Sequence, residues 1–394
     1  MKKRLALLLV FVLAVSAFGF AGCAPKAAEP AAEPAAAEGD VIKIGVFEPM
    51  TGANAAGGAM EVEGAQLANK LYPEVLGKKI ELVVVDNKSD KVEAANAATR
   101  LIEKEKVVAI IGSWGSSLSM AAGPIVQEAQ VPAVGASCTN PLVTFGNDYY
   151  FRVCFIDPFQ GTVMANYAFN ELGTKKAAII QEVSNDYSVG LAKFFTDAFV
   201  QLTGDANAIV EVSSYNTGDQ DFSAQLQNVA AKKPDVIFAP GNFTESAMLI
   251  KQAKEQGITI PFLGGDTWET PEFLTVGGDA VNGAVYSFFY DSQAFSTDLG
   301  KQFTEEYTKQ YSKDPAGVTA LGFDAYMVIY DAIQRANSSD PKAIRDALAA
   351  TKDYPGAAGV ITLDENGDAV KSAVIKKVEN GQFVYMTTVE PIKK

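Results

Sequence analysis

Residues 107–140 read VVAIIGSWGSSLSMAAGPIVQEAQVPAVGASCTN, and this stretch decides the fold class. Two short apolar runs, at 107–111 and 131–134, flank a segment with helical spacing at 119–130. Apolar runs of this length bounded by turn residues are typical of buried strands. The stretch therefore predicts a strand–helix–strand unit of a parallel sheet with a right-handed crossover.

The same alternation continues on both sides of this stretch. Further apolar runs predict buried parallel strands at 41–47, 80–85, 177–180, 236–239 and 262–263. Segments with helical spacing lie between them, at 61–71, 91–104, 159–172, 191–202, 222–232 and 244–256. Because these units form two series separated by an irregular stretch, we expect an α/β protein with two doubly wound lobes.

The last part of the chain follows a different pattern. Residues 359–369 and 372–385 alternate apolar and polar side chains around Asn366-Gly367 and Asn380-Gly381, two dipeptides typical of hairpin turns. They predict a small antiparallel meander. The acidic run at 364–368 resembles a calcium loop only in part, because its glycine comes two positions early, so we interpret it as a turn and predict no metal site.

The N-terminal residues predict export. Three basic residues at 2–4 precede an apolar run at 5–15, and small residues then lead to Cys23, which resembles a bacterial lipoprotein signal. We interpret 1–22 as a signal peptide, Cys23 as the lipid attachment point, and the Ala/Glu/Pro-rich segment 23–39 as a tether that cannot bury enough apolar surface to fold. The alternative is an uncleaved anchor, because the apolar run approaches membrane-spanning length.

The composition excludes several classes of function. The 394 residues include no His, so Ser-His-Asp catalysis and His-ligated zinc are excluded. The glycine-rich motifs that bind dinucleotides or triphosphates do not occur. Removal of the three basic residues of the signal peptide would change the net charge from −14 to −17, which disfavours nucleic acid as a partner. We therefore expect a protein that is not an enzyme and has no cofactor.

Two cysteines, Cys138 and Cys154, follow the predicted lipidation site. An exported protein occupies a compartment in which a disulfide persists, and a pair of free buried thiols is the alternative. The spacing in sequence does not decide between them, because a disulfide depends on the distance between the two Cα atoms.

The candidate site is expected in the loops that follow the strands, because ligands of open α/β sheets bind beyond the carboxyl ends of the strands. Loop 112–117, Gly-Ser-Trp-Gly-Ser-Ser, follows one strand and precedes a helix, so its hydroxyl and N–H groups predict an anion site at a positive helix end. Ser137 and Thr139 follow the next strand and offer further donors. Simple helix capping is the alternative for either loop alone, and two such loops at adjacent strand ends favour the anion site.

Two residues of the second series are candidates for the other half of the site. Asp266 follows the apolar run at 262–263, where its carboxylate could receive a ligand ammonium, although capping or a turn is the commoner role of such an Asp. Tyr187 follows the run at 177–180 and is expected to close over the ligand together with Trp114, as an apolar or cation–π wall.

These loops, in this order, resemble the leucine/isoleucine/valine-binding proteins of ABC amino-acid importers, the branched-chain family of type I periplasmic binding proteins. The resemblance covers essentially all of 41–390. Each phrase that carries it is weak alone, but the set is specific: Ile44-Gly45, Pro49-Met50-Thr51-Gly52, Val85-Asp86, Ile111-Gly112-Ser113, Pro132-Ala133-Val134, Thr139-Asn140-Pro141, Phe151-Arg152 and Asn185-Asp186-Tyr187.

The resemblance assigns roles to the candidate residues. It implies that the α-carboxylate of an amino acid is held by Ser116, by the backbone of Ser137 and by Thr139. It implies that the α-ammonium meets the carboxylate of Asp266 and the hydroxyl of Tyr187.

The chain departs from the family in the part of the site that would receive the ligand side chain. The family often has Tyr in the first loop, where this chain reads Ala55-Ala56-Gly57-Gly58, and another Tyr where Asn242 stands. The side-chain pocket is therefore expected to differ. The alternative ligands are an amide, a urea-like compound, a short peptide or an aromatic acid.

The resemblance also implies an organisation and a function. The chain would cross between the lobes three times, giving a first lobe of 40–156 plus 289–360 and a second lobe of 157–288 plus 361–394. We expect an exported, lipid-anchored, monomeric binding protein, in the periplasm or on the outer face of the cytoplasmic membrane. It would capture an amino acid, branched-chain or otherwise apolar, and deliver it to an ABC permease; a sensory ligand-binding component is the alternative.

Overall fold

The computed structural model describes residues 41–294 and 297–391. The predicted signal peptide, Cys23 and the tether lie outside the described residues. Within the described ranges, no helix combines the length and apolar character needed to cross a membrane.

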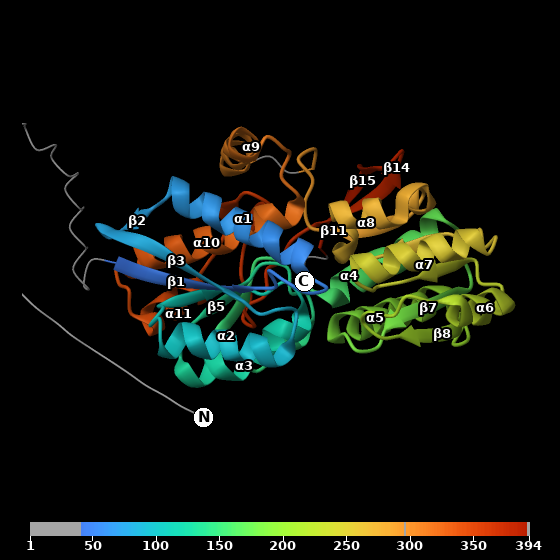
Figure 1. The fold of residues 1–394 in the computed structure, drawn as a ribbon, viewed down its shortest axis with the longest axis horizontal. Coiled ribbons are helices and arrows are strands. Elements are labelled where there is room, and N and C mark those ends of the chain that lie inside the picture. The colour runs from blue at the N-terminus through green and yellow to red at the C-terminus, as the bar shows by residue number, and fades with distance from the viewer. Residues whose placement is uncertain (1–40, 295–296, 392–394) are drawn as a thin grey trace, which may run out of the picture. The chain divides into compact units, whose positions relative to one another are not determined.

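The first sheet has six strands in the order β2-β3-β1-β4-β5-β6 (Figure 1). All neighbouring pairs are parallel except β2 with β3. The strands are β1 (Val41–Glu48), β2 (Glu74–Val75), β3 (Lys78–Asp86), β4 (Ala109–Ile111), β5 (Ala133–Gly135) and β6 (Tyr150–Arg152).

Helices cover both faces of this sheet, as the doubly wound pattern predicts (Figure 1). Ile44 and Val46 of β1 belong to the core that contains α1, whereas the next residue, Phe47, packs with Leu101 of α2 and Leu118 of α3. The helices are α1 (Ala55–Leu71), α2 (Lys91–Glu103), α3 (Ser116–Ala129), η1 (Pro141–Val143), α9 (Asp298–Tyr311), α10 (Gly317–Ala336) and α11 (Pro341–Ala349).

The second sheet has seven strands in the order β15-β14-β11-β10-β9-β7-β8. The parallel strands are β7 (Ala177–Glu182), β8 (Ile209–Tyr215), β9 (Val236–Phe238), β10 (Phe262–Gly264) and β11 (Val285–Phe288). The helices beside it are α4 (Asp157–Asn166), η2 (Tyr167–Glu171), α5 (Asp186–Thr203), α6 (Ser223–Lys232), α7 (Phe243–Glu255), η3 (Asp266–Trp268), α8 (Pro271–Gly277) and η4 (Gly278–Val281).

The C-terminal antiparallel meander is also present. β14 (Ala373–Glu379) and β15 (Gln382–Val389) form a hairpin around Asn380-Gly381 and extend the second sheet through β11. The turn at Asn366-Gly367 is closed by a single bridge between Leu363 and Ala369 rather than by two full strands. A separate two-stranded sheet pairs β12 (Tyr354–Gly356) with β13 (Gly359–Ile361).

The chain passes between the two sheets three times, after β6, after β11 and after β13. The second passage leads to α10, which returns to the first sheet and packs along α1. The two helices approach closely because each has a glycine at the contact: a Cβ at Gly64 would lie 2.0 Å from the carbonyl oxygen of Thr319, and one at Gly322 would lie 2.2 Å from that of Glu61.

Candidate functional site

A cavity that is partly open to solvent is lined by loops from the carboxyl ends of strands in both sheets. This is where the site was expected from the open α/β architecture. Six of the seven residues predicted for ligand binding line the cavity: Trp114, Ser116, Ser137, Tyr187, Asn242 and Asp266.

The seventh predicted residue, Thr139, is not among the lining residues. Its side chain is fully buried, and its carbonyl oxygen accepts a 3.0 Å hydrogen bond from the N–H group of Asp157 at the start of α4. Thr139 therefore lies behind the cavity wall, between two residues, Cys138 and Asn140, whose carbonyl oxygens are also engaged.

The loop before α3 is built to present its N–H groups rather than to cap them with a side chain. The N-cap residue is Gly115, which has φ +88° and no side-chain capping bond. The hydroxyl of Ser116 instead accepts a 3.1 Å hydrogen bond from the N–H group of Asn140, so the two predicted carboxylate-binding loops are joined directly. The capping alternative thus does not describe this loop, and the positive end of α3 faces the cavity.

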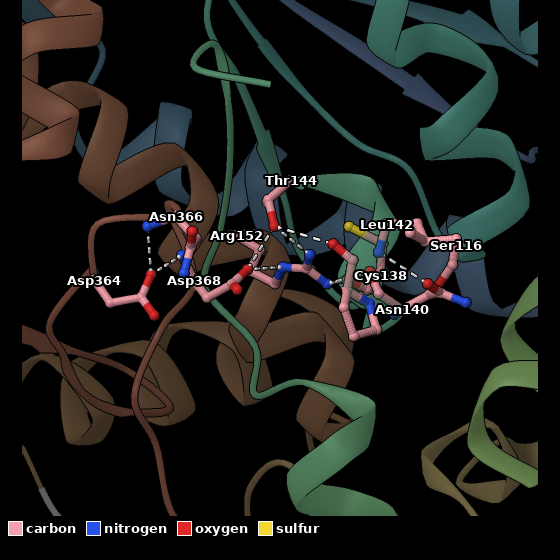
Figure 2. Close-up of polar contacts among 10 residues, drawn as sticks. Ser116, Cys138, Asn140, Leu142, Thr144, Arg152, Asp364, Asn366 and Asp368 are labelled. Carbon is pink, nitrogen blue, oxygen red and sulfur yellow. Dashed lines mark hydrogen bonds and ion pairs between the residues drawn. The ribbon is translucent and has the colours of Figure 1, made fainter. Parts of the chain in front are cut away.

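A buried arginine supports the loop that contains Thr139 (Figure 2). The guanidinium of Arg152 donates to the carbonyl oxygens of Cys138 and Asn140 at 2.5 and 2.9 Å and to the hydroxyl of Thr144 at 2.8 Å. Its Nε lies 2.7 Å from Oδ1 of Asp368. Arg152 thus fixes the course of this loop with hydrogen bonds, and Asp368 balances its charge.

The carboxylate of Asp368 is positioned by the turn at 364–368. Oδ1 of Asp364 accepts hydrogen bonds from the N–H groups of Asn366 and Asp368 at 2.9 and 3.0 Å, which closes the turn (Figure 2). The run that partly resembles a calcium loop therefore positions a partner for Arg152. Among the described residues, no group of three His, Cys, Asp or Glu side chains could hold a metal ion.

The second half of the site centres on Asp266, the first residue of η3, which follows β10. Its carboxylate is 2% exposed, and Oδ1 accepts hydrogen bonds from the hydroxyl of Tyr187 at 2.9 Å and from Nε2 of Gln160 at 2.6 Å. Burial raises the pKa of Asp266 to about 6, and the two hydrogen bonds oppose that rise. No Lys or Arg of the described residues forms an ion pair with Asp266, so a cationic group of a ligand would find an unpaired carboxylate there.

Sequence reasoning missed a pair of buried glutamates behind the first half of the site. Glu61 accepts a hydrogen bond from the hydroxyl of Ser137, and Glu48 accepts one from the N–H group of Trp114 at 2.6 Å. Burial, and for Glu48 also the nearby charge of Glu61, raises both pKa values, that of Glu61 to about 7. The pair therefore retains at least one proton near neutral pH.

A third glutamate, Glu182, was also missed and lines the cavity from the end of β7. It accepts hydrogen bonds from the N–H group of Asn242 at 3.2 Å, from Nδ2 of Asn185 at 3.1 Å and from the hydroxyl of Thr217. Glu48 and Glu182 share a sequence signal, because each is a charged residue at the last position of a buried strand.

Trp114 and two asparagines occupy the region in which the family often has Tyr. The ring of Trp114 lies against Gly57, where a Cβ would come within 2.4 Å of Cδ2, and it meets Phe243 edge-on with centroids 6.4 Å apart. Nδ2 of Asn242 donates a 3.0 Å hydrogen bond to Oδ1 of Asn54 from the other sheet. Gly57, in the first turn of α1, thus makes room for the aromatic ring of Trp114.

Cys138 and Cys154 are both buried and free in the structure. Burial raises the pKa of the Cys138 thiol to about 11 and raises that of Cys154 as well, so both remain protonated at neutral pH. The structure thus shows the free-thiol alternative rather than a disulfide.

Comparison with known proteins identifies the family. A family model described as periplasmic binding protein matches residues 41–382. The chain belongs to this family. Its members are extracytoplasmic solute-binding proteins, and the fold expected from the resemblance is the fold observed.

Solved structures of periplasmic binding proteins match over nearly the whole described region. A leucine binding protein (LivK) from Thermotoga maritima has 45% identity and a TM-score of 0.86, over 89% of this chain and 99% of that one. A branched-chain amino acid transporter substrate binding protein (LivJ) from Streptococcus pneumoniae, in complex with isoleucine, has 32% identity and a TM-score of 0.83, over 89% and 100%. An ABC transporter solute binding protein from Rhodopseudomonas palustris, in complex with 3,4-dihydroxybenzoic acid, has 26% identity and a TM-score of 0.79, over 90% and 98%.

Proposed function

We propose that this periplasmic binding protein captures an α-amino acid, branched-chain or otherwise apolar, between its two sheets and delivers it to the permease of an ABC importer. The names of the Thermotoga and Streptococcus structures support this ligand class. The ligand would drive closure of the two halves because it binds the closed form more tightly than the open form.

The observation that carries the proposal is the pairing of opposite chemistries across one cavity. The N-terminus of α3, with the hydroxyl of Ser116 and the backbone N–H group of Ser137, offers donors to a carboxylate. Asp266 offers an unpaired buried carboxylate, with the hydroxyl of Tyr187 beside it, to an ammonium. An α-amino acid carries both groups on one carbon and satisfies both halves.

The ligand side chain would rest against Trp114, with Asn54 and Asn242 at the same cavity. This wall differs from the Tyr-containing wall that the family often has, so the preference among apolar side chains is a property of this chain. We propose that Thr139 contributes through the loop that Arg152 supports, because its side chain lies behind the wall.

We propose binding without chemical turnover. The chain has no His, and the two carboxylates that line the cavity, Glu182 and Asp266, are hydrogen-bonded to neighbouring side chains and, for Glu182, to a backbone N–H group. A bound amino acid recovered unchanged after long incubation is the expected result, and any conversion would contradict it.

An aromatic acid is the second candidate ligand, because the Rhodopseudomonas structure contains 3,4-dihydroxybenzoic acid. Such a ligand has a carboxylate for the α3 end but no ammonium for Asp266. Binding an aromatic acid would leave the Asp266 carboxylate buried without a cationic partner, which is unfavourable. The structure therefore favours the amino acid.

We propose that the protein is exported through the signal peptide at 1–22 and held at the outer face of the cytoplasmic membrane by a lipid on Cys23, with 23–39 as the tether. It would act as a monomer. These proposals rest on the sequence pattern alone, and mass spectrometry of the membrane fraction tests them: a diacylated N-terminal Cys23 is expected, and an intact Met1 would contradict it.

A thermal-shift screen against the amino acids, amides and aromatic acids tests the ligand class. A ligand at 100 times its Kd adds roughly 2.7 kcal/mol to the free energy of unfolding. A rise in Tm with leucine, isoleucine or valine is expected. A rise with aromatic acids alone would contradict the proposal.

A further inference from the structure

Asp186, the first residue of α5, makes four hydrogen bonds to the other half of the site. Oδ2 of Asp186 accepts hydrogen bonds from Nζ of Lys91, at the start of α2, and from the hydroxyl of Ser117, at the start of α3, both at 2.8 Å. The Ser117 hydroxyl also accepts from the N–H group of Asp186 at 3.0 Å. The carbonyl oxygen of Asp186 accepts from Nδ2 of Asn140 at 2.9 Å.

The contacts with Ser117 and Asn140 each lie one residue away from a residue predicted for the site. Ser117 follows Ser116, Asn140 follows Thr139, and Tyr187 follows Asp186. Because the backbone links each pair rigidly, the contacts of Asp186 fix the position of Tyr187 relative to the two loops that face the ligand carboxylate. The Asn54–Asn242 hydrogen bond and the edge-on contact of Trp114 with Phe243 also join the two halves by side chains.

We infer that Asp186 is a positioning residue that holds the two halves of the site in their ligand-binding register without touching the ligand. This inference rests on the proposed function, because the register matters only if a ligand is captured between the halves. Asp186 does not line the cavity, although its neighbours Asn185 and Tyr187 do. Its carboxylate therefore bonds to Lys91 and Ser117 of the other half rather than to the ligand.

The contacts of Asp186 differ in how much each one stabilises the arrangement of the two halves. The ion pair with Lys91 is exposed, with side chains 52% and 44% accessible, so it contributes little and weakens with salt. The contacts with Ser117 and Asn140 are partly buried and involve backbone groups, so they contribute more. Although burial raises the pKa of Asp186, the hydrogen bonds from Lys91 and Ser117 lower it overall, so the carboxylate is ionised at neutral pH.

The experiment compares Asp186→Ala with Asp197→Ala. Asp197 lies on the same helix and pairs with Lys193 at the surface, so the second variant is a matched control that leaves the contact between halves intact. Ser117→Ala is a second test, because it removes the hydrogen bonds between Ser117 and Asp186 but keeps the carboxylate of Asp186 at the start of α5. The readouts are the dissociation rate of leucine by stopped flow, and the separation of dyes attached at Glu103→Cys and Lys232→Cys, one on each half, with Tm as the check on folding.

Loss of one charge-assisted hydrogen bond corresponds to about a tenfold or larger change in an equilibrium constant. We expect Asp186→Ala to raise the leucine dissociation rate about tenfold or more and to widen the dye separation. Ser117→Ala should change both quantities in the same direction by a smaller amount. Asp197→Ala should change neither the dissociation rate nor the dye separation. A dye separation in Asp186→Ala equal to that in Asp197→Ala would overturn the inference. If the unmodified protein binds no amino acid, the proposed function is wrong. The dye separation in Asp186→Ala, compared with that in Asp197→Ala, then still tests whether Asp186 holds the two halves together.

Discussion

The hydroxyl of Tyr187 donates a 2.9 Å hydrogen bond to Oδ1 of Asp266. The two residues come from the start of α5 and from the start of η3, and they form the half of the cavity proposed to hold an ammonium group. Gln160 donates to the same oxygen at 2.6 Å, so Asp266 is fixed in place by two neutral donors and has no protein cation among the described residues. This arrangement leaves its negative charge for the ligand.

Asp266→Asn should abolish high-affinity amino-acid binding. Removing one partner of a buried, hydrogen-bonded charge pair costs roughly 2–5 kcal/mol, which is about thirtyfold or more in Kd. Isothermal titration calorimetry with leucine checks this, with Asp279→Asn at the exposed surface as the control. Unchanged affinity in Asp266→Asn would remove Asp266 from the site.

Amino-acid affinity should fall in acid. The pKa of Asp266 is raised to about 6, so the carboxylate that binds the ligand ammonium becomes protonated below that pH while the ligand ammonium keeps its charge. Kd is expected to rise towards about tenfold per pH unit below pH 6 and to be nearly constant above pH 7. Asp266→Asn should lack this dependence, and a wild-type Kd that does not change between pH 7.5 and 5 would contradict the assignment.

The contribution of Glu61 to the free energy of unfolding of the ligand-free protein should fall as pH rises from about 5 to 8. Burial raises the pKa of Glu61 from 4.5 to about 7, so between these values the folded state holds a proton that the unfolded state has lost. Stability therefore falls with rising pH across that window, by roughly 3 kcal/mol at most.

Urea unfolding of Glu61→Gln at several pH values measures this contribution. The variant should show a flatter dependence than wild type, whereas Glu128→Gln at an exposed position should follow wild type. Parallel curves for Glu61→Gln and wild type would show that Glu61 titrates normally.

Arg152→Met should destabilise the fold and the site together. The substitution removes the cationic partner of Asp368 and one donor each from the carbonyl oxygens of Cys138 and Asn140, and breaking a buried ion pair costs about 3–5 kcal/mol. Arg100→Gln, which removes an exposed pair with Glu105, should cost less than about 1 kcal/mol. Equal losses in urea unfolding for the two variants would contradict the role given to Arg152.

Gly57→Ala should weaken ligand binding by displacing Trp114. A Cβ at this position would lie 2.4 Å from Cδ2 of the indole, so the ring of Trp114, which lines the cavity, must shift. Overpacking of this kind costs about 1–3 kcal/mol. Gly123→Ala in α3 is the control, because its Cβ would come no closer than 3.4 Å to another atom; equal leucine affinity in both variants would show that the position of Trp114 does not matter.

The sequence predicted the fold wherever apolar runs were long enough to recognise. The strands predicted at 41–47, 80–85 and 177–180 are present as β1, β3 and β7. β6 and β11 were missed because they contain polar or aromatic residues, Tyr-Phe-Arg and Val-Tyr-Ser-Phe, and so do not form an apolar run. β8 was missed because it lies at the edge of its sheet, with Val212 exposed and polar residues at 211, 213 and 214. Tertiary packing rather than local pattern defines these strands.

The candidate site was predictable where a loop joins a strand to a helix. Trp114, Ser116, Tyr187 and Asp266 were found that way and line one cavity. Glu61 could not be found, because it lies inside α1 and becomes a site residue only when the helix packs beside Ser137. The free thiols at 138 and 154 were likewise undecided by spacing, because the separation of two residues in space depends on the fold.

The most direct test of the central claim is isothermal titration calorimetry of the purified protein with leucine, isoleucine, valine and 3,4-dihydroxybenzoic acid at pH 7.5. The account predicts one-to-one binding of at least one of the three amino acids, lost in Asp266→Asn, and much weaker binding of the aromatic acid. Tight binding of the aromatic acid, retained in Asp266→Asn, with no heat from any amino acid would contradict it.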